Sequence, residues 1–118
     1  MKTLIVGASP NPDRYAHRAA LKLLQHGHEV VLLGLQHGEV AGHPILTSHP
    51  ELADIDTVTL YVGPRNSGEY ADYLKKIRPR RVIFNPGAEN PDLAATLRAN
   101  GIEPVEACTL VMLSVGSY

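Results

Sequence analysis

The chain has 118 residues, 44% of them hydrophobic, so it can bury the core of one domain but has no room for a second. A net charge of −1 and a pI near 6.6 exclude the basic surface that nucleic-acid binding requires, so we expect no nucleic-acid partner. The single cysteine, Cys108, excludes an intrachain disulfide and fits a reducing compartment. No apolar run is long enough for a signal peptide or a membrane span, so we expect a cytoplasmic protein without membrane attachment.

Five short apolar runs predict buried strands. In chain order they are residues 3–6, 29–33, 57–62, 81–84 and 104–107. The runs are continuous rather than alternating, which is typical of strands in a parallel sheet that is covered on both faces.

Apolar residues at helical spacing follow the first and third runs. One stripe spans residues 16–24 and ends at Gly27, and another spans residues 70–77. Asn66, with Glu69 three positions later, resembles a capping box that would open the second helix. This alternation of strands and helices predicts an α/β fold.

The last part of the chain has clear helix boundaries. Asn90 can cap a helix, Pro91 suits its first position, residues 93–97 supply its apolar face, and Gly101 suits its left-handed end. The tail, residues 109–118, fits either a short helix or a sixth strand, and its periodicity does not decide between them.

Glycines and prolines interrupt residues 35–56, so we expect no full crossover helix there, although residues 48–51 could start one helical turn. The predicted fold is a single Rossmann-like doubly wound α/β domain over residues 1–118, with a mostly parallel five-stranded sheet.

Ligands of such sheets bind beyond the carboxyl ends of the strands. Glycine follows four of the five predicted strands, where it lets a ligand approach the backbone and leaves N–H groups free for phosphate. The candidate binding residues at these ends are Gly7, Ala8, Ser9, Asn11, Gly34, Val62, Gly63, Pro64, Asn85, Pro86, Gly87 and Cys108. Arg14, at the entrance of the first helix, can add a positive charge for a phosphate.

The loop Gly7-Ala8-Ser9-Pro10-Asn11-Pro12 is nearly a dinucleotide fingerprint, but Ser9 and Pro12 stand where G-x-G-x-x-G has its second and third glycines. The second strand ends in Gly34-Leu35-Gln36, without the acid that would bind the ribose of NAD. An NAD(P)-binding oxidoreductase or redox-sensing fragment is therefore the alternative rather than the first interpretation.

Four motifs together resemble the small CoA-binding-domain proteins, which are similar to the N-terminal domain of the succinyl-CoA synthetase α subunit. They are the loop at residues 7–12, the strand end at residues 60–64, Asn85-Pro86-Gly87, and Glu106-Ala107-Cys108. The resemblance implies that Gly7, Ser9 and Asn11 hold the CoA diphosphate, that residues 62–64 line the adenosine side, and that residues 85–87 follow the pantetheine. Cys108 matches a cysteine of the synthetase domain.

By this resemblance the ligand is CoA or an acyl-CoA. The six histidines form no H-E-x-x-H motif and have no cysteine partners at ligand spacing, so no metal is expected. The chain cannot contain the phosphohistidine and nucleotide-grasp domains of the synthetase, so we expect a non-catalytic or regulatory binding protein. Apolar residues left uncovered on the helix of Tyr70 and Tyr73 would indicate a homo-oligomer or another protein partner. A further hypothesis is that mild oxidation joins the Cys108 thiol to the CoA thiol as a mixed disulfide.

Overall fold

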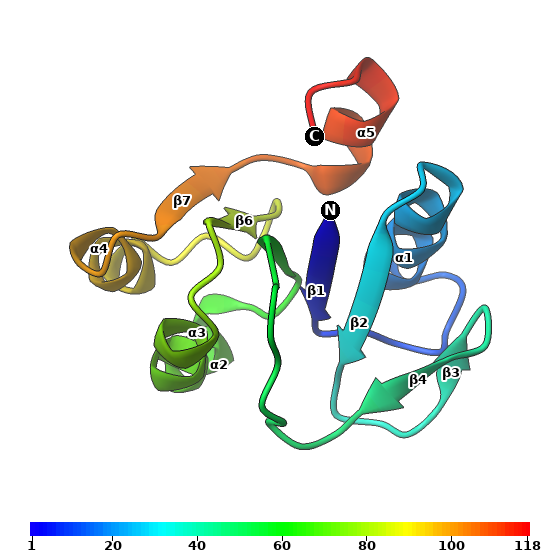
Figure 1. Cartoon of the computed structure of the whole chain (residues 1–118), viewed down its shortest axis with the longest axis horizontal. Helices are drawn as coiled ribbons and strands as arrows, with labels where there is room; N and C mark the ends of the chain where they lie inside the picture. The colour runs from blue at the N-terminus through cyan, green and yellow to red at the C-terminus, as the bar shows by residue number, and fades with distance from the viewer.

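Strands and helices alternate along the chain in the computed structural model, which describes residues 1–118 (Figure 1). The strands are β1 (Lys2–Val6), β2 (Glu29–Leu33), β3 (Glu39–Val40), β4 (His43–Leu46), β5 (Thr57–Leu60), β6 (Arg81–Phe84) and β7 (Glu103–Glu106). The helices are α1 (Tyr15–Gln25), α2 (Pro64–Ser67), the 3₁₀ turn η1 (Gly68–Tyr70), α3 (Ala71–Ile77), α4 (Pro91–Ala99) and α5 (Thr109–Val115).

All strands join one sheet in the order β3-β4-β2-β1-β5-β6-β7. Every neighbouring pair is parallel except β3 and β4, which are antiparallel. If β3 is left out and the parallel strands are renumbered 1 to 6 along the chain, their order in the sheet is 3-2-1-4-5-6, as in Rossmann sheets. The expected α/β class and mostly parallel sheet are confirmed, but the five-strand prediction is wrong because the sheet has seven strands.

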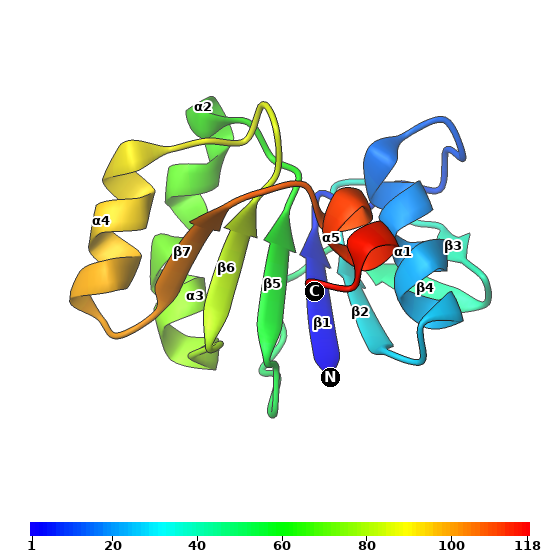
Figure 2. The same cartoon turned by 90° about the horizontal axis from the view of Figure 1, so that it is seen from above.

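Helices cover both faces of the sheet (Figure 2). One core cluster joins Leu4, Val58 and Phe84 of the strands to residues of α3 and α4 such as Leu74 and Leu97. A second cluster packs the opposite face against α1 and α5. Strand residues of both clusters are almost fully buried, which explains why the strand sequences are continuously apolar.

The two strands that the sequence did not predict form a hairpin at one edge of the sheet. The turn between β3 and β4 places Ala41 at φ 50° and Gly42 at φ 83°, the left-handed pair that a type I′ turn requires. Pro44 lies in β4 opposite Glu39, in the short antiparallel pairing at the edge of the sheet. The glycine that looked like a breaker is therefore a turn residue, and the proline lies in β4 just before its register with β2 begins at Ile45.

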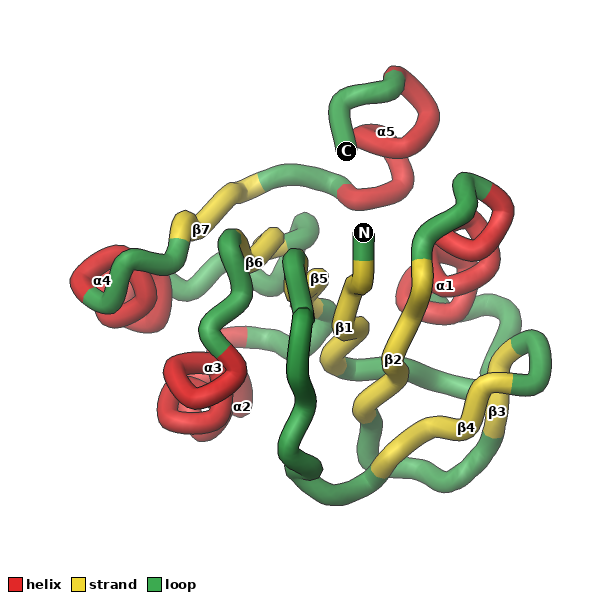
Figure 3. The backbone as a smooth tube through the Cα atoms, viewed as in Figure 1, coloured by secondary structure: helices red, strands yellow, loops and turns green.

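The remaining boundaries divide between confirmed and wrong predictions. The Asn90 side chain accepts a hydrogen bond from the Leu93 N–H at 3.1 Å, which confirms the predicted cap of α4. The capping box at Asn66 is wrong, because α2 already begins at Pro64 and Asn66 lies inside it. Residues 48–51 form no helical turn, and the connection from β4 to β5 is a loop throughout (Figure 3).

The tail forms helix α5, which settles the choice between helix and strand. Beyond α5, the Tyr118 side chain returns to the sheet, where its hydroxyl contacts the Thr3 hydroxyl and its ring lies 4.7 Å from the Arg81 guanidinium. None of the helices combines the length and apolar character that crossing a membrane demands.

Candidate ligand-binding cleft

A cleft of about 740 Å³ opens at the carboxyl ends of the parallel strands. The arrowheads of these strands point to one edge of the sheet, and the loops that line the cleft follow them (Figure 2). The lining residues come after β1, β2, β5 and β6 and from the start of α1: Gly7, Ala8, Ser9, Arg14, Tyr15, Ala16, Gly34, Leu35, Gln36, Tyr61, Val62, Gly63, Asn66, Glu69, Tyr70, Pro86, Gly87 and Ala88. β1 lies between β2 and β5, where the strand order reverses, which is the position that open α/β sheets use for ligands.

Gly7 has no space for a side chain. Its φ is +94°, and a Cβ atom would lie 3.1 Å from the Tyr61 carbonyl carbon and 3.2 Å from Val62 Cγ2. The Gly7 and Ala8 N–H groups both donate to the Leu33 carbonyl at 2.9 Å, so the loop turns sharply away from β1. Glycine at this position lets two strand ends and the loop meet at the floor of the cleft.

Helix α1 begins at the wall of the cleft without a side-chain cap. Arg14 is its N-cap residue and supplies no capping hydrogen bond, and the first helical bond is from the Arg18 N–H to the Arg14 carbonyl at 3.2 Å. The N–H groups of Tyr15, Ala16 and His17 therefore have no acceptor in the protein. Such N–H groups, the helix dipole and the Arg14 guanidinium together favour an anion here.

Ser9 and Asn11 hold the loop in shape. The Asn11 N–H donates to Ser9 Oγ at 3.1 Å, and the Asp13 N–H donates to Asn11 Oδ1 at 3.0 Å. His17 Nδ1 lies 3.0 Å from the Ser9 carbonyl oxygen and ties the loop to α1. Ser9 lines the cleft, whereas Asn11 lies outside its lining.

Asn85 is a structural residue in this fold. Its side chain is 2% exposed, and its Nδ2 donates to Thr59 Oγ1 at 2.7 Å and to the Leu60 carbonyl at 3.0 Å. Its Oδ1 accepts from the Thr109 N–H at 2.9 Å and thereby fastens the start of α5 to the sheet. All of these bonds are internal, and Asn85 does not line the cleft.

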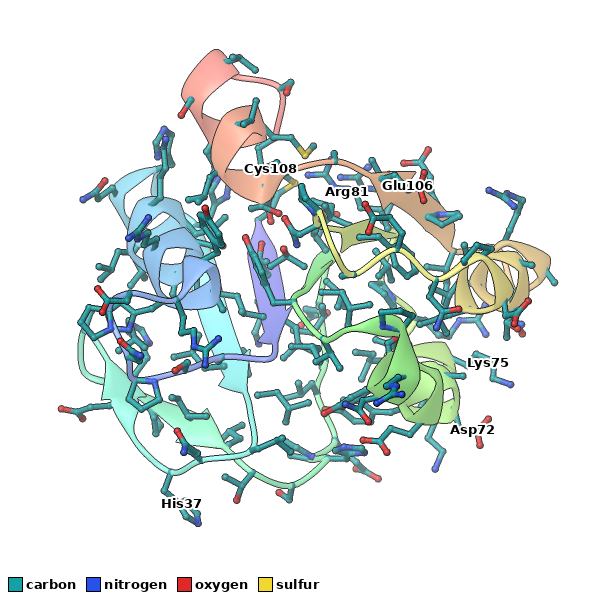
Figure 4. All side chains as sticks on the ribbon, turned by 180° about the vertical axis from the view of Figure 1, so that it is seen from behind. His37, Asp72, Lys75, Arg81, Glu106 and Cys108 are labelled. Atoms are coloured by element: carbon teal, nitrogen blue, oxygen red, sulfur yellow. The ribbon has the colours of Figure 1, made fainter.

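Nine of the thirteen residues chosen from the sequence line the cleft, and four do not: Asn11, Pro64, Asn85 and Cys108. Pro64 occupies the first position of α2. Cys108 is half-buried. It is the N-cap residue of α5 and lies at the start of that helix (Figure 4). The structure thus brings the first three glycine loops and Pro86-Gly87 together, and it leaves the thiol outside their cleft.

Sequence reasoning missed the tyrosines of the cleft. Tyr61 follows β5, and its buried hydroxyl has no hydrogen-bond partner; burial raises the pKa of this phenol to about 12, so it stays neutral. Tyr70 lines the cleft, and its ring lies tilted against that of His49 in the β4–β5 loop, at 5.1 Å between ring centroids. Tyr70 ends η1 and Tyr73 lies in α3; they are 5% and 8% exposed, so they form no uncovered apolar surface. The sequence predicted a strand over residues 57–62, which placed Tyr61 inside it, whereas β5 ends at Leu60 and leaves Tyr61 in the cleft.

These features define an open α/β domain with glycine loops and an uncapped helix at the switch point of its sheet, a class that binds ligands at this edge. The model of the CoA binding domain family matches residues 1–114, and the chain belongs to this family. No match is found among curated proteins.

Solved structures are similar over nearly the whole chain. An uncharacterized protein is 50% identical, with 99% of this chain and 97% of that chain covered and a TM-score of 0.97. A hypothetical protein from Pyrococcus horikoshii OT3 is 28% identical, with 96% and 81% covered and a TM-score of 0.87. A dinucleotide forming acetyl-coenzyme A synthetase from Ca. Korarchaeum cryptofilum, 16% identical, shares the fold over 90% of this chain and 25% of that chain, with a TM-score of 0.74.

Proposed function

We propose that this chain binds CoA or an acyl-CoA in the cleft, through its glycine-containing strand-end loops, as a non-catalytic or regulatory protein. The observation that carries the proposal is the uncapped start of α1, where Arg14 and the free N–H groups of Tyr15 and Ala16 face a cleft whose floor is Gly7. A diphosphate needs this combination of backbone donors, helix dipole and one cation. Membership of the CoA binding domain family supports CoA as the ligand that contains this diphosphate.

The chemistry of the cleft supports binding rather than catalysis. His17 engages the Ser9 carbonyl instead of the Ser9 hydroxyl, so it does not activate that hydroxyl as a nucleophile. No three His, Cys, Asp or Glu side chains gather as a metal site would require.

Two glycine substitutions test the proposal. A Cβ atom at Gly63 meets no other atom within 4 Å, and its N-cap φ of −65° suits any residue, so Gly63→Val keeps the fold but places a branched side chain at the cleft wall. Gly68 has equally open surroundings, with φ −60°, but lies outside the lining, so Gly68→Val is the matched control.

Isothermal titration with CoA should show binding by wild type and Gly68→Val, and at least roughly 10-fold weaker binding by Gly63→Val. Equal affinities for the two variants would show that the cleft is not the site. Titration with NAD in competition tests the alternative: displacement of CoA by NAD at lower concentration would favour the NAD(P)-binding interpretation, which the missing acid after β2 argues against.

A further inference from the structure

The cleft has almost no charge with which to recognise a terminal phosphate on the adenosine. Of the lining residues, only Arg14 is cationic and only Glu69 is anionic. CoA carries two phosphate groups that need neutralising, the diphosphate in its middle and the 3′-phosphate on its ribose. The two groups are attached to different carbons of the ribose, the 5′ and the 3′ carbon.

We infer that the site does not recognise the 3′-phosphate, so that the chain takes dephospho-CoA as readily as CoA. This inference rests on the proposed function, and it concerns which part of the ligand the protein distinguishes. We assign the Arg14 guanidinium to the diphosphate, because Arg14 lies at the N-terminus of α1 beside the free N–H groups of Tyr15 and Ala16.

The ribose end of the cleft offers only neutral groups. In sheets of this kind the ribose lies at the end of the second strand, which is Gly34-Leu35-Gln36 here. The Gly34 N–H already donates to the Leu46 carbonyl at 2.9 Å, but the Gln36 amide and the backbone N–H groups of Leu35 and Gln36 can bond to a hydroxyl as well as to a phosphate oxygen. Leu35 is 90% exposed and adds no polar group. His37 lies outside the lining, and its side chain points away from the molecule (Figure 4).

Glu69 adds an opposing charge. Glu69 is a lining residue of the same cleft, and a carboxylate there repels the dianionic 3′-phosphate, whereas it can accept a hydrogen bond from a free ribose hydroxyl. The one acid therefore reduces any preference for the phosphorylated ligand that Arg14 could give at long range.

The test compares the affinities of CoA and dephospho-CoA by isothermal titration for the wild type and two variants. Gln36→Arg places a cation inside the cleft lining at the end of β2. His37→Arg places the same cation one residue away, outside the lining, and is the matched control. Circular dichroism and the melting temperature verify that both variants are folded.

We expect the wild type and His37→Arg to bind the two ligands within ~3-fold of each other, and Gln36→Arg to prefer CoA by on the order of 10-fold or more, as a charge-assisted contact gives. A wild-type preference for CoA of about 10-fold or more would overturn the inference while leaving CoA binding intact. Absence of binding for both ligands would instead overturn the proposed function, and this inference with it.

Discussion

Replacing Asn85 by alanine should destabilise the protein severely, because its buried amide joins three parts of the fold. The substitution removes the bonds to Thr59 Oγ1 at 2.7 Å, the Leu60 carbonyl at 3.0 Å and the Thr109 N–H at 2.9 Å. Thr59 keeps the Thr109 hydroxyl at 2.7 Å, but the Thr109 N–H is left buried without an acceptor. At about 1 kcal/mol for each lost bond, and more for the orphaned N–H, the free energy of unfolding should fall by about 3–4 kcal/mol.

In a chain of this length such a loss lowers Tm by roughly 10–15 °C, which thermal unfolding followed by circular dichroism measures directly. Asn85→Asp keeps the acceptor for Thr109 and should lie between the wild type and Asn85→Ala. The exposed Asn100, whose Nδ2 donates to the Thr96 carbonyl at 2.8 Å, supplies the control: Asn100→Ala should change Tm by only about 1–3 °C. A Tm of Asn85→Ala within about 3 °C of the wild type would refute the structural role.

Three more measurements probe other parts of the molecule. The pKa of Tyr61 is about 12 in the folded state, against an ordinary value of 10.0, so its stabilising contribution is complete below pH 10 and is lost as the pH rises toward 12. Tyr61→Phe should therefore make Tm less dependent on pH in this range. An unchanged dependence would contradict the burial of the phenol. Ala41→Asn, at φ 50° in the β3–β4 turn, should raise the free energy of unfolding by about 0.5–1 kcal/mol in urea titration, whereas Ala41→Val should lower it. The Cys108 hypothesis predicts that diamide, as the oxidant, takes the two thiol hydrogens of Cys108 and CoA and leaves a disulfide-linked adduct of CoA mass; its absence, or its persistence in Cys108→Ser, would end that hypothesis.

The sequence predicted the central sheet well because those strands are buried on both faces. Leu4, Val58 and Val82 face one core and Ile5 the other, so no polar alternation obscures the apolar runs. The role of Asn90 as the cap of α4 could be predicted equally well, since an N-cap followed by proline is a local signal that does not depend on the rest of the fold.

The edge hairpin could not be predicted from the sequence, because its pairing depends on the rest of the fold. Strands β3 and β4 are two and four residues long, and the pairing of Glu39 with Pro44 depends on β4 lying beside β2. Local propensity at Gly42 and Pro44 argues against a strand, and tertiary pairing overrides it.

The cleft could be located from the strand ends, but side-chain direction there could not. Asn85 and Pro86 are adjacent in the chain, yet the first points into the core and the second lines the cleft. A glycine acts through its backbone, so its role can be predicted from the sequence. The role of Asn85 depends instead on Thr109, which lies 24 positions away.

The return of Tyr118 to Thr3 brings the two ends of the described chain together beside the amino end of β1, while the cleft lies beyond the carboxyl ends of the strands (Figure 2). A short flexible linker can therefore join residue 118 to residue 1, and new ends can be opened at the exposed Ala41-Gly42 turn. The circularly permuted chain would keep every parallel strand pair and every loop of the cleft. Fluorescent reporters attached at the original ends would likewise stand on the side of the sheet away from the ligand.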